Sequence, residues 1–272
     1  MKQLLLFAFC AFGFFGFSQK MPGDYFNEGY EFYKNENFDE AIASYNYIKD
    51  NYPKYDDYPS TIYNLACAYF AHEDFREAIE TFDIILNGDF NERESVAGRI
   101  MSNPYANYRH NSSMLMSTIY TRLEIYDSAL VYLSYSDTLY TLQHDCVRAY
   151  VEEDVGIAMR YAEIYHKIGN NNEAIRVLLP LVWGEYFDNT DLLAELKKLL
   201  MSEKGVQKKL DRALKKIESA TYKTYTYYSF YLYGTKIRVP DEYVRPKPFN
   251  LEKTTDKIKE SKFYKMIEEF SK

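Results

Sequence analysis

The chain has 272 residues, of which 47% are hydrophobic, and carries a formal net charge of −7 with only three cysteines. This length allows one elongated domain or two compact ones, and three cysteines exclude a small disulfide-stapled scaffold. Residues 19–189 are acidic, with 13 basic and 28 acidic side chains, whereas residues 190–272 carry 19 basic and 12 acidic ones. The acidic body argues against general nucleic-acid binding by residues 19–189.

The first residues of the chain, MKQLLLFAFCAFGFFGFSQK, have the layout of a secretory signal peptide. Lys2 precedes an apolar run from Leu4 to Phe17, and Ser18 is a small residue at a cleavage position. The alternative is a membrane anchor, but the run is shorter than the roughly 20 residues that a membrane-spanning helix needs. We therefore expect residues 1–18 to be removed. The remaining chain is expected to be exported across the inner membrane of a bacterium, as a periplasmic or secreted protein without stable membrane insertion.

One short pattern occurs four times between residues 22 and 187. It is seen in FDEAIASYNYIKDNYP, which begins at Phe38, and returns as FREAIETF, YDSALVYL and NNEAIRVL. The shared alanines are Ala41, Ala78, Ala129 and Ala174. Nine residues before each alanine lies an aromatic residue: Phe32, Tyr69, Tyr120 and Tyr165. Twelve residues before each alanine lies a small residue: Gly29, Ala66, Ser117 and Ala162. Small residues on two facing helices allow a close approach, and the aromatic residues fill the space beside it.

This pattern resembles the tetratricopeptide repeat, a 34-residue helix–turn–helix unit. About four copies cover residues 22–187, although none carries the family's tryptophan. The resemblance implies an all-α fold, a right-handed solenoid in which stacked helix pairs bury a continuous core. We assign residues 19–187 to this repeat domain. The spacing between copies is irregular, and we expect a short helix followed by a loop in the insertion at residues 91–110.

Two further segments are expected directly after the repeats. Apolar residues at helical spacing in residues 188–220 predict two helices around Gly205, which would cap the open end of the solenoid. Residues 221–240 are dense in Tyr, Thr and Phe, which favour strands. They predict a β-hairpin with strands 222–233 and 236–239.

Residues 241–272 are expected to form an extended linker and a last helix. Prolines mark the linker, whereas residues 251–271 place apolar side chains on or near one helical face.

The sequence shows no pattern typical of catalysis. It holds no P-loop, dinucleotide-binding fingerprint, nucleophile elbow or HExxH motif. His144 and Cys146 lie beside acidic residues, but residues two apart on a helix point away from one another and would not converge on a metal. An exported location allows a disulfide between Cys67 and Cys146, yet buried cysteines without a bridge are common. We expect no enzymatic activity, no metal, no cofactor and no such disulfide.

The resemblance also implies a concave face lined by the first helix of each pair. At the family's concave positions, the first two copies place mainly aromatic residues and the later copies mainly polar and charged ones. The candidate partner-binding residues are Phe26, Tyr30, Tyr33, Tyr63, Phe70, Met114, Arg122, Met159, His166 and Lys167. Exposed aromatic residues are typical of an interaction surface. The alternative is that the insertions or the tail fold back and cover this face.

Two functions are consistent with these features. The first is a non-enzymatic scaffold of the cell envelope that binds a protein or peptide segment, and not nucleic acid, through its concave face. The alternative is a structural subunit of an envelope or secretion assembly that docks through the C-terminal hairpin and basic tail. A free hairpin edge favours this alternative because it can accept an added strand.

Overall fold

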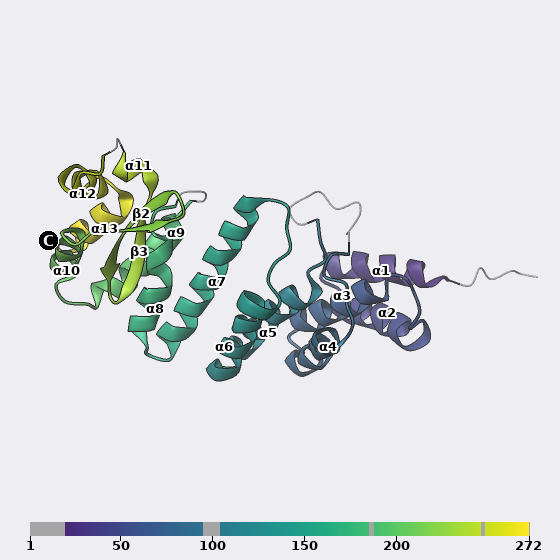
Figure 1. Ribbon diagram of the computed structural model, residues 1–272. Helices are drawn as coiled ribbons and strands as arrows, with labels where there is room; N and C mark the ends of the chain where they lie inside the picture. Colours follow the sequence, from purple (N-terminus) through teal and green to yellow (C-terminus); the bar gives the residue numbers. More distant parts are fainter. Residues whose placement is uncertain (1–19, 95–103, 185–187, 246–247, 272) are drawn as a thin grey trace, which may run out of the picture. The chain divides into compact units, whose positions relative to one another are not determined.

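The computed structural model of the protein describes residues 20–94, 104–184, 188–245 and 248–271. The signal peptide expected at residues 1–18 lies outside these ranges, and so does the middle of the insertion in which a short helix is expected. Figure 1 shows the described chain as a succession of helices with a small sheet in its C-terminal part. The chain divides into two compact units, up to Ala78 and from Ile79 onward.

The first unit consists of helices that pack in sequence. They are α1 (Pro22–Lys34), α2 (Phe38–Asn51), α3 (Tyr58–Ala71) and the start of α4 (Phe75–Asn87). α1 packs on α2, and α2 packs on α3. Gly29 of α1 is buried, and a Cβ atom there would lie 2.9 Å from the ring of Tyr45 on α2. A small residue at this position is therefore what permits the close approach of the two helices.

The second unit also begins with consecutive helices. They are α5 (Tyr108–Arg122), α6 (Tyr126–Ser134), α7 (Val147–Lys167), α8 (Asn171–Leu178), α9 (Thr190–Met201) and α10 (Val206–Leu214). A π-helical turn, η1 (Tyr135–Leu139), continues α6, and a 3-10 turn, η2 (Leu179–Leu181), continues α8. α5 packs on α6, α6 on α7, α7 on α8, and α8 on α9. This order of packed neighbours is compatible with a helical repeat fold.

The same turn follows α1, α3, α5 and α7. Two residues after each of these helices, the backbone is left-handed, with φ between 60° and 79°, at Glu36, Glu73, Glu124 and Gly169. The next backbone N–H donates to a carbonyl five residues back, in the pairs Asn37 to Phe32, Asp74 to Tyr69, Ile125 to Tyr120 and Asn170 to Tyr165. Such bonds satisfy carbonyls at a helix C-terminus. The acceptors are the four aromatic residues that the sequence pattern aligns, and the four aligned alanines are fully buried. The four helix pairs therefore share one local geometry.

The turn after α7 is the one of these four that uses glycine, which permits a test of its geometry. Gly169→Ala is expected to lower the free energy of unfolding by about 1 kcal/mol, because a Cβ atom disfavours positive φ. A Cβ atom at Gly169 would meet nothing within 4 Å, so crowding contributes nothing. Gly156 inside α7 has equally open surroundings. Gly156→Ala is therefore the control and should raise stability by about 0.5–1 kcal/mol. Urea denaturation measures the free energy of unfolding of both variants. Equal changes in the two variants would contradict the left-handed turn at Gly169.

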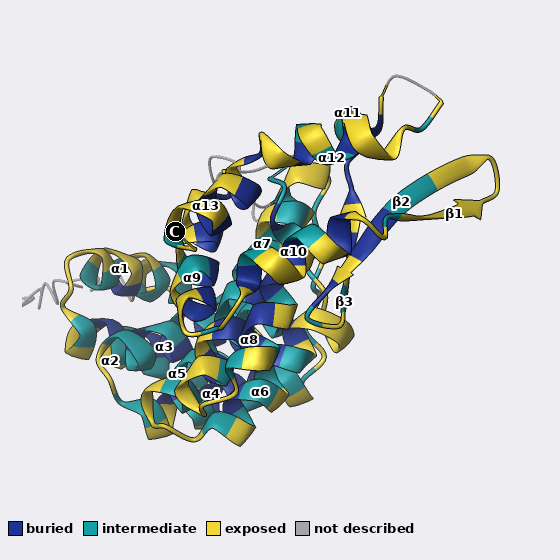
Figure 2. Cartoon of the chain, turned by 90° about the vertical axis from the view of Figure 1, so that its left-hand side faces the viewer, coloured by how far each residue is buried: buried dark blue, intermediate teal, exposed yellow. Residues whose placement is uncertain are grey.

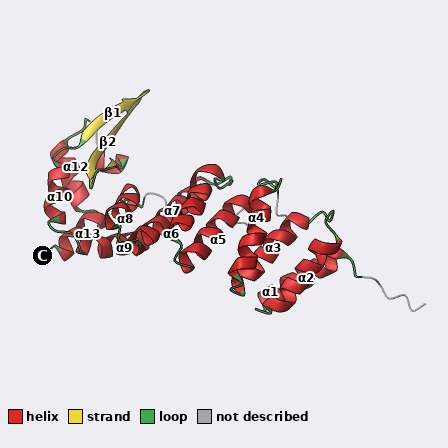
Figure 3. Ribbon diagram, turned by 90° about the horizontal axis from the view of Figure 1, so that it is seen from below, coloured by secondary structure: helices red, strands yellow, loops and turns green. Residues whose placement is uncertain are grey.

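A three-stranded antiparallel sheet follows α10, with its strands drawn in yellow in Figure 3. Its strands are β1 (Glu218–Tyr222), β2 (Tyr225–Leu232) and β3 (Thr235–Val239), in the order β1-β2-β3. The predicted hairpin is present as β2 and β3, but the sheet has one strand more than predicted. Residues 218–220, which form most of β1, belong to the segment predicted as a helical pair. Lys223 adopts a left-handed conformation (φ 54°), so a tight turn returns the chain and pairs Tyr222 with Tyr225.

The sequence predicts one C-terminal helix over residues 251–271, but the structure has two helices there. These are α12 (Leu251–Lys259) and α13 (Lys262–Phe270). Ser261 separates them: its hydroxyl oxygen accepts from the Tyr264 N–H at 3.2 Å and its hydroxyl donates to the Ile258 carbonyl at 2.6 Å. A serine that caps a new helix competes with continuation of the previous one. A short helix, α11 (Asp241–Val244), lies within the segment predicted as an extended linker.

One large hydrophobic core contains side chains of the four helices from α7 to α10, of the sheet, and of the last two helices. The sheet contributes alternate residues of β2 and β3, because successive side chains of a strand point to opposite faces. The buried members are Phe230, Leu232, Ile237 and Val239. β1 contributes nothing to this core, since all five of its residues are exposed.

Candidate functional site

Five of the ten predicted binding residues lie on α1 and α3 of the first unit. Phe26 and Tyr33 are half-buried and pack against the hydrophobic cluster of this unit. Burial raises the pKa of the Tyr33 hydroxyl, so this group stays neutral. Tyr63 and Phe70 are also half-buried, whereas Tyr30 is 45% exposed. Tyr30 therefore offers the most open aromatic surface of the five.

Two hydrogen bonds join α5 to α7 in the second unit. His110 Nε2 lies 2.9 Å from Glu153 Oε1, and Arg160 Nη1 donates to Thr118 Oγ1 at 2.6 Å. His110 Nδ1 also lies 2.9 Å from the carbonyl oxygen of Tyr140. The bridged residues follow in the same order along both helices, about two turns apart. α5 and α7 therefore run in the same direction, as the first helices of successive pairs should.

Between α5 and α7 lies a cavity of about 150 Å³. Its lining consists of Ser117, Thr118, Thr121, Arg122, Arg160, Glu163 and Ile164. Two guanidinium groups and one carboxylate therefore border one small space. Guanidinium groups bind carboxylates with paired hydrogen bonds, and a carboxylate such as Glu163 accepts from amide or ammonium groups. The cavity can accordingly accept a carboxylate group.

The other five predicted binding residues lie on α5 and α7, and their surroundings differ from one residue to the next. Arg122 lines the cavity, and Lys167 forms a 3.8 Å ion pair with a carboxylate of the lining. His166 is exposed near the end of α7. Met114 and Met159 pack against hydrophobic clusters instead. Among the described residues, the cavity lining thus includes one of the five, Arg122.

Arg160 is the basic lining residue that is missing from the predicted set. The repeat register selected Met159, and one residue along a helix turns the side chain by about 100°. A usable signal was Glu163, which the resemblance also places on the concave side of the fourth copy although it is not one of the ten candidates. Residues three or four apart share one helical face, so Arg160 and Lys167 both align with Glu163.

The described residues hold no cluster of three or more His, Cys, Asp or Glu side chains that could bind a metal ion. The histidine considered from the sequence is engaged locally, since the Cys146 backbone N–H donates to His144 Nδ1 at 2.9 Å. Within the same ranges, neither Cys67 nor Cys146 takes part in a disulfide.

The tip of the sheet is a second exposed feature, here called the exposed arm (residues 218–226). Every residue of the arm is exposed, and Tyr222 and Tyr225 are 63% and 68% exposed. Figure 2 shows β1 in the yellow of exposed residues. β1 is an edge strand of the sheet, so the outer side of its backbone has no strand neighbour among the described residues. Such an edge can pair with a strand of another chain.

No model of a known protein family matches the sequence, and no curated protein matches it. In the part of the chain that the structure describes, no helix is long and apolar enough to cross a membrane.

Proposed function

We propose that the protein is a non-enzymatic scaffold of the tetratricopeptide type that binds a protein or peptide segment outside the cytoplasm. The helix pairs would stack into a right-handed solenoid whose first helices line a concave face. The common turn geometry of the four pairs and the burial of their shared alanines support this repeat assignment.

The cavity between α5 and α7 carries the binding part of the proposal. At about 150 Å³ it is smaller than the roughly 300–1,000 Å³ of pockets for drug-sized ligands. Its size suits a single side chain of a longer segment. Arg122 and Arg160 would pair with a carboxylate, and Glu163 would accept from the amide groups next to it. The expected partner is therefore a segment that carries an acidic residue.

A peptide selection tests this proposal. Random peptides selected on the immobilised chain should be enriched in Asp or Glu at one fixed position. The double variant Arg122→Ala, Arg160→Ala should bind these peptides at least about tenfold more weakly, because each lost charged hydrogen bond is worth roughly 1.5–3 kcal/mol. Fluorescence anisotropy of a labelled peptide measures the affinity.

The control variant is Arg148→Ala, since Arg148 lies on the same helix α7 and its exposed side chain pairs with Glu152 at 2.7 Å. It should leave binding unchanged. Selected peptides without an acidic position, or equal affinity for the double variant and wild type, would refute the proposal.

The exposed arm favours a second candidate function, that of a structural subunit which docks by strand addition. The observation is the full exposure of β1 at a sheet edge. Proteins that co-purify with the wild-type chain distinguish the two functions. If the double variant Tyr222→Ser, Tyr225→Ser loses the main partner and the variant Arg122→Ala, Arg160→Ala keeps it, docking through the exposed arm is favoured. The opposite pattern would favour the cavity.

A further inference from the structure

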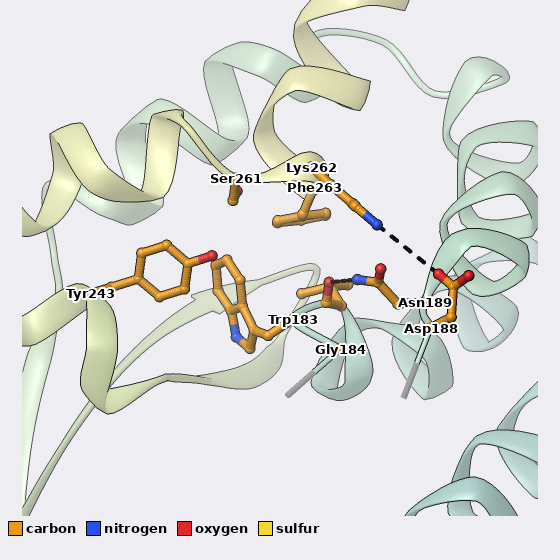
Figure 4. Close-up of a pocket in the computed structure, with 9 residues that line it drawn as sticks. Trp183, Gly184, Asp188, Asn189, Tyr243, Ser261, Lys262 and Phe263 are labelled. Carbon is orange, nitrogen blue, oxygen red and sulfur yellow. Dashed lines mark hydrogen bonds and ion pairs between the residues drawn. The ribbon is translucent and has the colours of Figure 1, made fainter. Parts of the chain in front are cut away.

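A separate cavity of about 260 Å³ lies in the C-terminal part of the second unit (Figure 4). Its lining comes from the residues after η2, the residues just before α9, the start of α13, and α11. It consists of Val182, Trp183, Gly184, Asp188, Asn189, Tyr243, Ser261, Lys262 and Phe263. None of these residues was singled out from the sequence. Most of the accessible lining is polar, and Trp183 and Tyr243 supply a smaller aromatic wall, with the buried ring of Phe263 behind it.

Trp183 is the centre of the aromatic wall. Its ring centroid lies 5.3 Å from that of Tyr243 and 5.7 Å from that of Phe263. Its indole N–H donates to the carbonyl oxygen of Arg238 at 2.6 Å, and the ring of Phe230 packs beside it. These contacts hold the indole in one orientation, so the aromatic surface is preformed.

Asn189 supplies the inner part of the polar wall and is only 5% exposed. Its amide nitrogen donates to the carbonyl oxygen of Val182 at 2.6 Å. Because that carbonyl can only accept, the orientation of the amide is fixed, and its oxygen faces the cavity (Figure 4). No hydrogen bond within the described residues reaches this oxygen. The oxygen borders the cavity, so a donor group of a ligand can bond to it there.

Asp188 and Lys262 form the outer part of the polar wall, with 4.0 Å between Asp188 Oδ1 and Lys262 Nζ. The hydroxyl and the backbone N–H of Thr190 both donate to Asp188 Oδ1, at 2.6 and 3.1 Å. These bonds lower the pKa of Asp188, so the group is a carboxylate at neutral pH. The polar wall thus offers two acceptors, Asn189 Oδ1 and the Asp188 carboxylate, and one cationic donor, Lys262.

We propose that this cavity binds a single sugar ring, either a free monosaccharide or the terminal residue of a glycan. Sugar hydroxyls both donate and accept, so they match the acceptors Asn189 and Asp188 and the donor Lys262 together. The C–H face of the ring would lie against the aromatic wall. An ammonium ligand would pair with Asp188 but face Lys262, and a carboxylate ligand would pair with Lys262 but face Asp188 and the Asn189 oxygen, so a neutral ligand with hydroxyl groups fits both side chains better. The volume lies just below the range for drug-sized ligands and suits one ring.

The single tryptophan of the chain makes the test specific, because Trp183 fluorescence reports on this cavity alone. Glucose, galactose, mannose and N-acetylglucosamine are titrated separately into the full chain. At least one of them should change the emission saturably. Lys262→Met and Asp188→Asn should each weaken that response about tenfold, because each removes one charged hydrogen bond to the ligand.

The matched control is Lys259→Met, because Lys259 pairs with Asp256 at 3.6 Å on α12 but does not line the cavity. It should leave the response unchanged. The proposal is overturned if all four sugars give neither a fluorescence change nor saturation transfer to their protons in NMR. It is equally overturned if acetate or methylammonium binds more tightly than the sugars, or if Lys262→Met and Asp188→Asn both respond as the wild type does. Peptide binding at the α5–α7 cavity is measured separately. A failure of that proposal would not change the outcome of the sugar titration.

Discussion

Gly29→Leu is expected to destabilise the first unit by about 3 kcal/mol or more, the upper range for overpacking a buried site. A Cβ atom alone at this position would lie 2.9, 3.0 and 3.2 Å from three ring atoms of Tyr45. The Tyr45 ring is only 1% exposed and packs edge-on against Phe26, so it has no free space to occupy. Thermal unfolding followed by circular dichroism measures the loss.

Gly156→Leu is the matched substitution, because a Cβ atom at Gly156 meets nothing within 4 Å. It should be neutral or slightly stabilising, since leucine favours a helix over glycine. The contrast between the two variants isolates helix crowding from helix propensity. Equal unfolding temperatures for Gly29→Leu and the wild type would contradict the packing of α1 on α2 described above.

Phe230→Ala is expected to destabilise the second unit by about 3–5 kcal/mol, as large-to-small changes at buried aromatic residues do. Phe230 on β2 is fully buried, pairs with Ile237 on β3, and packs against Trp183. Removal of its ring would also loosen the environment of Trp183. Chemical denaturation measures the stability, and a red shift of the tryptophan emission should accompany the loss.

Tyr231→Ala is the control, because Tyr231 is the next residue of β2 and is 51% exposed on the opposite face. Its effect should stay within about 0.5 kcal/mol, as for most surface substitutions. If the two variants lost similar stability, the assignment of faces along β2 would be wrong.

The two proposed sites have different physical character. The α5–α7 cavity is small, lined by charged groups, and bordered by two parallel helices, which suits one side chain of an extended segment. The Trp183 cavity is larger and pairs aromatic rings with fixed polar groups, which suits a compact ligand. A protein with both could bind a peptide and a sugar independently, and the single-site variants above separate the two activities.

The helix pairs could be predicted because their determinants are local. The buried alanines, the aromatic residues nine positions earlier and the left-handed turn all recur at fixed spacing, so the register of each pair follows from neighbours along the chain. The strand β1 was missed because its residues are all exposed and show no apolar alternation. The division of the last helix rests on one serine cap, Ser261, inside an otherwise regular helical pattern.

By itself, the sequence determined the succession of helix pairs, the β2–β3 hairpin and the helical content of the C-terminus, since periodicity, turns and caps act over a few residues. The tertiary structure alone decided which side chains meet across elements. It placed Arg160 rather than Met159 beside Arg122, and it brought Lys262 to the same cavity as the distant Trp183 and Asn189. Such convergence depends on how helices cross and rotate against each other, and a shift of one residue in a helix is enough to exchange a core side chain for one in a site.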